Sequence, residues 1–288
     1  MKHFIRITVV MLCALVGFMA FPYEYADADE IPVEAAEETL ESLQTLYQPY
    51  ITNISAYKPV YFLMGADPED SRFQLSFKYQ LFGEDSPLAP RCCWATNIYL
   101  GYTQTSSWDL ESDSAPFEDT SYQPEVFFLT DNLSKRGGWL DGFFFQGGVQ
   151  HESNGQGGDE SRSTNYVYLN PMAIFYGENS KIGFSIAPKL VWFFNNSDDS
   201  NPYIEDYRGN FELEIKAGIP ESVVIGSKFR FASEGTSVQV DMTYPLSMAF
   251  FSNLEFYLHV QYADNLAETL LNYEERTEAF RIGFSIVR

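Results

Sequence analysis

Residues 147–171 read GGVQHESNGQGGDESRSTNYVYLNP. Apolar Phe143, Phe145 and Val149 alternate with Gln146, Gly148 and Gln150 as the chain enters this stretch. The alternation resumes around Val167, after a Gly-rich acidic segment. A period of two residues is typical of β-strands, because successive side chains point to opposite faces. The stretch therefore predicts two adjacent strands joined by a loop.

Three polar residues fall on the apolar face of these two strands. Counting by twos places His151 and Ser153 with Val149, and Asn165 with Val167. In a soluble protein this face would be the core, where burial of a Ser–His pair is unfavourable. In a membrane barrel the same face would meet lipid. The pattern therefore favours a barrel that carries a base, a hydroxyl and a carboxamide on its outer surface.

The alternation continues along the rest of the chain. Segments 73–81 (FQLSFKYQL), 253–262 and 279–287 each place apolar residues on one face and polar residues on the other. A barrel with lipid outside and a polar interior has this pattern, and a β-sandwich has it with the faces reversed. Twelve strands are predicted, at 59–66, 72–82, 94–108, 119–131, 138–153, 163–176, 181–194, 206–218, 222–232, 236–246, 250–263 and 275–287.

The predicted connections alternate between short and long. Short turns are expected at 218–221 and 245–250, and long loops at 108–119, 154–162, 195–205 and 263–274. Outer-membrane barrels combine short periplasmic turns with longer external loops. We therefore predict an all-β fold, a twelve-stranded antiparallel transmembrane β-barrel. The 154–162 loop would be external, which puts the three polar residues toward the outer leaflet.

The N-terminal segment is predicted to lie outside the barrel. Lys2 and Arg6 precede an apolar run, and Ala26-Asp27-Ala28 offers a small-x-small cleavage pattern. Residues 1–28 are therefore interpreted as a signal peptide. Residues 29–58 would form a short periplasmic extension, with a possible helix where leucines recur at helical spacing, and 59–288 the barrel domain. No later apolar run approaches the ~18–20 residues of a membrane helix.

Composition narrows the classes of function. The formal net charge of −22 argues against a nucleic-acid partner, because phosphates need basic residues. Beyond the predicted signal peptide the cysteines are Cys92 and Cys93, adjacent in sequence and unable to link distant strands. Aromatic residues make up 17% of the chain. A soluble periplasmic β-protein and an outer-membrane barrel both remain open.

The spacing of His151 and Ser153 is compatible with nucleophilic chemistry. Two residues along a strand place their Cα atoms ~6.5–7 Å apart, near enough for the imidazole to accept the hydroxyl proton. Asn165 could orient the ring through its side-chain oxygen. The backbone N–H groups of Asn154 and Gly155, which follow the serine, would be candidates to stabilise an oxyanion. The alternative is an ordinary strand with two polar residues, which the cost of polar groups on a lipid face disfavours.

Two further features bear on a site. The loop from Gln156 to Ser161 is rich in carbonyl and hydroxyl oxygens, which suit a hard cation such as Ca²⁺. His259 falls on the polar face of its strand, so we expect it in a hydrogen-bond network of the barrel lumen.

The motif Gly147-x-x-x-His151-x-Ser153-Asn154-Gly155, followed by Arg162-Ser163-x-Asn165, resembles the signature of the outer-membrane phospholipase A family. Segments YTQTSSWDL (102–110), Ser114-x-Pro116-Phe117 and Tyr122-x-Pro124 are similar to further conserved segments of that family. The resemblance is strong from Arg72 to Tyr168 and fainter beyond. It implies a twelve-stranded barrel in the outer membrane of a Gram-negative bacterium.

The resemblance also implies roles for individual residues. His151 would be the general base, Ser153 the nucleophile and Asn165 the residue that orients His151, with the backbone N–H groups of Ser153 and Gly155 as the oxyanion hole. Calcium would bind at a homodimer interface through the carbonyl of Gln156, the hydroxyl of Ser161 and Ser114 of the partner subunit. Gln104 would lie in that interface. The implied activity is hydrolysis of phospholipid acyl esters, with A1, A2 and lysophospholipase specificities.

The sequence departs from the family at two places. Gln156 stands where an arginine is usual, and the chain ends on Arg288 instead of phenylalanine. Two alternatives remain open: a non-catalytic porin or structural barrel, and a soluble carbohydrate-binding sandwich.

Overall fold

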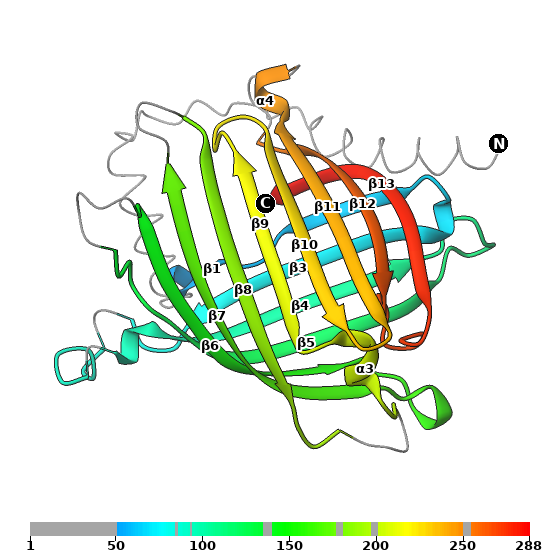
Figure 1. Ribbon diagram of the computed structural model, residues 1–288, viewed down its shortest axis with the longest axis horizontal. Coiled ribbons are helices and arrows are strands. Elements are labelled where there is room, and N and C mark those ends of the chain that lie inside the picture. The colour runs from blue at the N-terminus through cyan, green and yellow to red at the C-terminus, as the bar shows by residue number, and fades with distance from the viewer. Residues whose placement is uncertain are drawn as a thin grey trace, which may run out of the picture. The chain divides into compact units, whose positions relative to one another are not determined.

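The chain folds into a closed antiparallel β-barrel in a computed structural model (Figure 1). The structure describes residues 51–83, 86–92, 94–134, 140–176, 181–196, 201–249 and 255–288. Twelve strands, β2 to β13, pair in chain order, and pairing of β13 with β2 closes the ring. The predicted architecture is confirmed. The predicted signal peptide, the helix expected near the N-terminus and Cys93 lie outside the described residues.

The strands follow the predicted segments closely. A short strand before residue 59 joins the sheet as well, because β1 pairs with the end of β3 where β2 pairs with its beginning. The strands are β1 Ile54–Ala56, β2 Val60–Gly65, β3 Ser71–Gln80, β4 Ile98–Trp108, β5 Phe117–Leu129, β6 Gly142–Ser153, β7 Ser163–Tyr176, β8 Gly183–Phe193, β9 Phe211–Gly218, β10 Val224–Ala232, β11 Gly235–Pro245, β12 Tyr257–Leu266 and β13 Arg276–Val287.

Two strands begin later than predicted. The strand expected at 206–218 starts at Phe211, because helix α3 (Ile204–Arg208) precedes it and ends at Gly209, whose φ of 73° suits glycine. The strand expected at 250–263 starts at Tyr257. Helix α4 (Leu246–Ala249) follows β11, and a Leu246 N–Phe256 O bond of 2.8 Å closes a longer connection than the predicted turn.

The short and long connections alternate less regularly than predicted. The end of the barrel that carries the 154–162 loop also carries the tight turn at 233–234, and the opposite end carries the long connection 81–97. Hydrophobic periodicity fixes strand register but says little about loop length, so this part of the prediction was wrong in detail.

The two faces of the sheet have opposite character. Val126, Val149 and Phe284 point outward and are about half exposed, whereas Gln150 and Gln261 are buried inside. A β-sandwich would bury its apolar residues instead, so the faces identify a barrel with an apolar outer surface and a polar interior. His259 lies in that interior, as predicted, with Nε2 2.9 Å from Asp241 Oδ1.

No helix within the described residues is long and apolar enough to cross a membrane.

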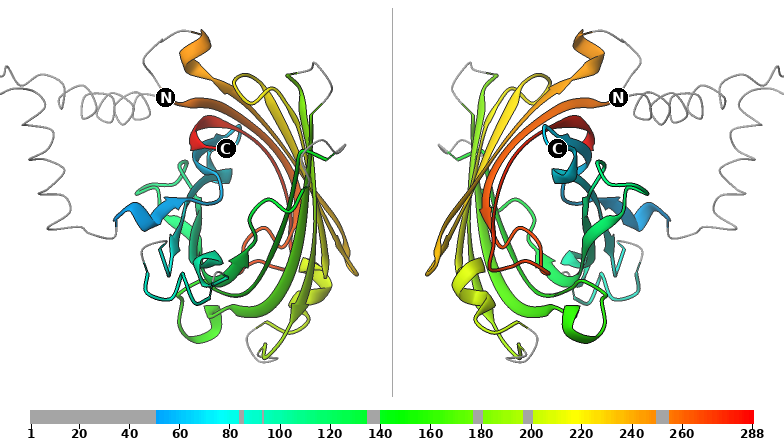
Figure 2. Two further views of the ribbon diagram at one scale, coloured as in Figure 1. Left: turned by 90° about the vertical axis from the view of Figure 1, so that its left-hand side faces the viewer. Right: turned by 90° about the vertical axis from the view of Figure 1, so that its right-hand side faces the viewer.

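The β12–β13 connection, 267–275, folds back into the barrel at the end that carries the 154–162 loop (Figure 2). Leu270 and Tyr273 pack with Ile204 of α3 in an apolar cluster. The backbone N–H groups of Leu270 and Leu271 donate to Asp119 of β5, at 2.9 and 3.0 Å. The connection therefore reaches from β12 and β13 to β5 and to α3, across the interior of the barrel.

Two buried salt bridges that share one carboxylate hold this connection in place. Glu268 forms salt bridges to Arg72, at 3.0 Å, and to Arg281, at 2.8 Å. Burial raises the pKa of the Glu268 carboxyl, but the two guanidinium groups outweigh that effect and lower the pKa to about 2. A depressed pKa means that ionised Glu268 stabilises the fold above its ordinary pKa, near 4.5. This contribution is lost as the pH falls toward 2.

We expect acid to loosen the 267–275 connection first. Hydrogen exchange at Leu270 and Leu271, corrected for the intrinsic rate, should accelerate between about pH 4.5 and pH 2, since protonated Glu268 leaves two buried guanidinium groups unpaired. Glu268→Gln should show fast exchange already at pH 7 and little further change with acid. Equal protection of both proteins across this range would contradict the role given to the two salt bridges.

Candidate active site

Strands β6 and β7 bring two of the predicted residues together. The two strands pair along their length, and His151 stands directly opposite Asn165. The His151 Nδ1 atom lies 2.8 Å from Asn165 Oδ1. Both residues are on the outward face of the barrel, and His151 is exposed. The alternation that suggested a common face is therefore reproduced, with a hydrogen bond between the two side chains.

The carboxamide of Asn165 is held in one orientation. Its Nδ2 donates to the backbone oxygen of Asn195 at 3.3 Å, which leaves Oδ1 facing His151. An oxygen can only accept, so Nδ1 of the imidazole carries the proton and Nε2 is left as an acceptor. This is the tautomer that a general base for a neighbouring hydroxyl needs.

Ser153 lies two residues along β6, on the same outward face. It stands opposite Ser163 of β7 on one side and Tyr122 of β5 on the other. Among the described residues no hydrogen bond joins Ser153 to His151. The fold thus places all three predicted residues on one patch of the outer surface and links two of them directly.

The backbone around Ser153 reduces the number of candidate oxyanion donors. The N–H of Asn154 donates to the carbonyl of Arg162 at 3.1 Å, so it does not face an oxyanion. Gly155 remains as a candidate donor, whereas Ser153 is paired within the sheet with Tyr122 and Ser163. Gly155 has φ 70°, and a Cβ there would lie 2.9 Å from the ring of Tyr122. Only glycine suits both the backbone conformation and this close approach.

Asn154 organises the loop that follows the serine, a role that the sequence did not indicate. Its Oδ1 accepts from the N–H groups of Gln156, at 3.3 Å, and Arg162, at 3.0 Å. Its Nδ2 donates to the carbonyl of Glu160 at 2.9 Å. The side chain is 3% exposed, so these bonds form away from water. An Asn-Gly pair after a strand would have signalled a side-chain-capped turn.

The loop ends hold the predicted calcium ligands. The backbone N–H groups of Gln156 and of Arg162, the residue after Ser161, donate to the same Asn154 oxygen, so the backbone at the two ends of the loop lies close together. Carbonyl and hydroxyl oxygens are donors that Ca²⁺ accepts. Within the described residues no group of three or more His, Cys, Asp or Glu side chains is placed to hold a metal. The donor set fits a hard cation but is incomplete in a single chain.

The two residues assigned to a partner contact are accessible. Ser114 is exposed in the β4–β5 connection, with φ 78°. Gln104 lies on β4 between Leu75 and Tyr122, and its Oε1 accepts from Tyr102 at 3.2 Å. A carboxamide among apolar residues is unusual on a surface that faces lipid.

A buried charge beneath the site was also missed by the sequence analysis. Glu152, between His151 and Ser153, points into the barrel and is 2% exposed. It accepts from Ser121 at 2.5 Å and pairs with Arg208 of α3 at 3.0 Å. A glutamate at an inward position of an alternating strand would have signalled such an ion pair. It ties α3 to the back of the strand that carries the site.

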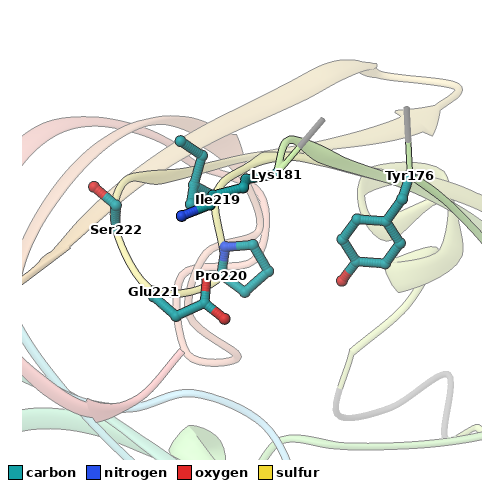
Figure 3. Close-up of a pocket in the computed structure, with 6 residues that line it drawn as sticks. All are labelled: Tyr176, Lys181, Ile219, Pro220, Glu221 and Ser222. Carbon is teal, nitrogen blue, oxygen red and sulfur yellow. The ribbon is translucent and has the colours of Figure 1, made fainter. Parts of the chain in front are cut away.

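A hollow of about 780 Å³ lies at the opposite end of the barrel (Figure 3). It is lined by Tyr176, Lys181, Ile219, Pro220, Glu221 and Ser222. None of the predicted site residues lines it. Its lining also lacks a serine–histidine pair, so it is not the candidate active site.

Comparison with known proteins identifies relatives over most of the chain. The family model described as Phospholipase A1 matches residues 42–286. Phospholipase A1 from Salmonella typhimurium is 29% identical over 227 residues, which cover 76% of this chain and 70% of that protein. Phospholipase A1 from Escherichia coli is 28% identical over the same length and coverage.

Solved structures with the same fold include two barrels. Outer membrane phospholipase A from Escherichia coli superposes with a TM-score of 0.66 at 24% identity, over 82% of this chain and 98% of that one. The outer membrane phospholipase dimer of Salmonella typhi, solved with bound calcium, gives a TM-score of 0.66 at 23% identity, over 84% and 94%. At these identities the structures support the fold.

Proposed function

Because this chain belongs to the phospholipase A1 family, we propose that it hydrolyses the acyl esters of phospholipids with Ser153 as its nucleophile. The coarser assignment, a phospholipase with an outer-membrane β-barrel fold, follows from the family and the architecture. The assignment of Ser153 as the nucleophile depends on one observation, the 2.8 Å contact of His151 with Asn165 next to Ser153 on the lipid-facing surface. A1, A2 and lysophospholipase specificities are all part of the proposal.

The proposed chemistry uses each residue in one role. His151 Nε2 accepts the proton of the Ser153 hydroxyl as its oxygen attacks the ester carbonyl, and then returns it to the leaving alcohol. Asn165 holds the ring with Nδ1 as the donor. Its neutral amide avoids placing a carboxylate at the lipid boundary. Water then hydrolyses the acyl-enzyme by the same proton path.

The negative charge of the intermediate needs stabilisation at the carbonyl oxygen. The N–H of Gly155 is the proposed donor, since the Asn154 N–H is already bonded and Ser153 is paired within the sheet. Gln156 and Ser161 would hold a calcium ion, which polarises the ester carbonyl directly or through water. Ser114 of the partner subunit would complete the ligand set.

We propose that the enzyme acts as a homodimer on lipids of the outer leaflet. Gln104 would be covered in the interface, which would remove its carboxamide from lipid. The dimeric relative with bound calcium supports this assembly by analogy. The alternative, a diffusion pore, is disfavoured because the 267–275 connection crosses the barrel interior.

Replacement of the two paired side chains should separate their roles. In an assay of fatty-acid release from phospholipid–detergent micelles, Asn165→Ala should lower the rate about 10–100-fold, the usual effect of losing an orienting partner. His151→Ala should lower it much further, because the general base itself is lost. Heat-modifiable gel mobility would report correct folding of both variants. Equal, negligible effects of the two changes would contradict the proposed triad.

A further inference from the structure

The edge of β7 extends beyond its neighbour at the candidate site. Strand β6 pairs with β7 as far as Ser163, whereas β8 begins pairing only at Tyr166, opposite Phe193. Residues 163–165 therefore have no β8 partner in the described part of the sheet. Backbone N–H groups at such an edge must find other acceptors, because unpaired ones destabilise the fold.

Asparagine side chains of the β8–β9 connection supply these acceptors. Asn196 Oδ1 accepts from the N–H of Asn165 at 2.9 Å, and Asn201 Oδ1 accepts from the N–H of Ser163 at 3.0 Å. The carbonyl of Asn165 accepts from the N–H of Phe194 at 3.0 Å. Two side chains therefore take the place of β8 at the point where β7 carries Asn165.

The β8–β9 connection also holds the side chain of Asn165, through the turn at Asn195 and Asn196. The carbonyl of Asn195 accepts from Asn165 Nδ2 at 3.3 Å, and Asn195 has φ 51°, a conformation that asparagine tolerates. Asn196 Oδ1 also accepts from the hydroxyl of Thr164 at 3.2 Å. Without this anchor the carboxamide could rotate by 180°, and its NH₂ group would then face the protonated Nδ1 of His151.

We infer that Asn196 is a positioning residue of the hydrolytic site. It fixes the backbone of Asn165 and the turn whose carbonyl fixes the Asn165 carboxamide, and through them the ring of His151. The inference rests on the proposed function, since it assigns Asn196 a role in the same triad. It makes no contact with the reacting atoms itself.

The test is a double-mutant cycle on fatty-acid release. Asn196→Ala should lower kcat about 3–10-fold with little change in KM, the effect of a loosened support. Asn196→Asp keeps an oxygen acceptor and should restore most of the rate. In an Asn165→Ala background the Asn196→Ala change should have no further effect on kcat, because the Asn165 carboxamide, through which Asn196 acts on His151, is already absent.

The matched control is Asn210→Ala. Like Asn196, Asn210 bonds the backbone of a neighbouring strand through its side chain: its Nδ2 donates to the carbonyl of Val191 of β8 at 3.0 Å, away from Asn165. It should leave kcat unchanged. If Asn196→Ala does not fold, Asn196→Gln, which displaces the carboxamide by one methylene, completes the same cycle.

The outcomes separate the inference from the proposed function. An equal loss from Asn196→Ala in both backgrounds, or the same loss from Asn210→Ala, overturns the positioning role. Full activity of Ser153→Ala would overturn the proposed function instead. An inactive Ser153→Ala protein with a non-additive Asn196–Asn165 cycle supports both.

Discussion

Replacement of Ser153 by alanine should abolish phospholipid hydrolysis, with a loss of at least about 10⁴-fold in kcat, while the barrel stays folded. The large effect follows because the nucleophile acts as a unit with its base, and removal of one member disables the whole. Ser153 faces outward at the end of β6, and its hydroxyl makes no hydrogen bond among the described residues, so the hydroxyl adds little to stability. Fatty-acid release and heat-modifiable mobility would measure activity and folding on the same samples.

A neighbouring serine supplies the control. Ser163 stands directly opposite Ser153 on β7, and Ser163→Ala removes the same hydroxyl group one strand away. It should retain most of the activity. Full activity of Ser153→Ala would show that the acyl chemistry lies elsewhere. Equal losses in the two variants would point to a general disturbance of this part of the sheet.

Strand positions and faces were predictable because a barrel repeats one simple rule. Each strand must present apolar residues to lipid and polar residues to the interior, so alternation reports both its position and its orientation. The same counting placed His151 and Asn165 on one face, and the strands then brought them into register. Short-range periodicity was therefore enough to predict the fold and the common face of these two residues.

The supports of the site were not predictable in the same way. Arg208 reaches Glu152 from α3, far along the chain, and Asn196 reaches Asn165 from the β8–β9 connection. These contacts depend on how loops fold over the barrel end, which no periodic pattern encodes. The bond that occupies the N–H of Asn154 likewise depends on closure of a loop onto Arg162.

Removal of calcium should lower hydrolysis at least about 100-fold, the order expected when a charge-stabilising group is lost at an ester carbonyl. The loop offers the carbonyl of Gln156 and the hydroxyl of Ser161, with no compact cage of carboxylates among the described residues. Few charged ligands predict weak binding to a monomer, with Kd near 10⁻⁴–10⁻³ M. Calcium titration of activity and of chemical cross-linking in detergent would measure both effects.

Dimerisation and calcium binding should be linked reciprocally if Ser114 of the partner subunit completes the ligand set. Cross-linking should then rise with calcium in the wild type and respond more weakly in Ser114→Ala. Ser114→Gly is the companion variant: φ at this position is 78°, so glycine removes the hydroxyl and relieves the backbone at once. If the cross-linking response to calcium is weaker in both variants, the effect is due to the loss of the hydroxyl. If it is weaker in Ser114→Ala alone, the effect is due to the backbone. A monomer that hydrolyses phospholipid at full rate in excess chelator would overturn the calcium-linked dimer while leaving the serine chemistry intact.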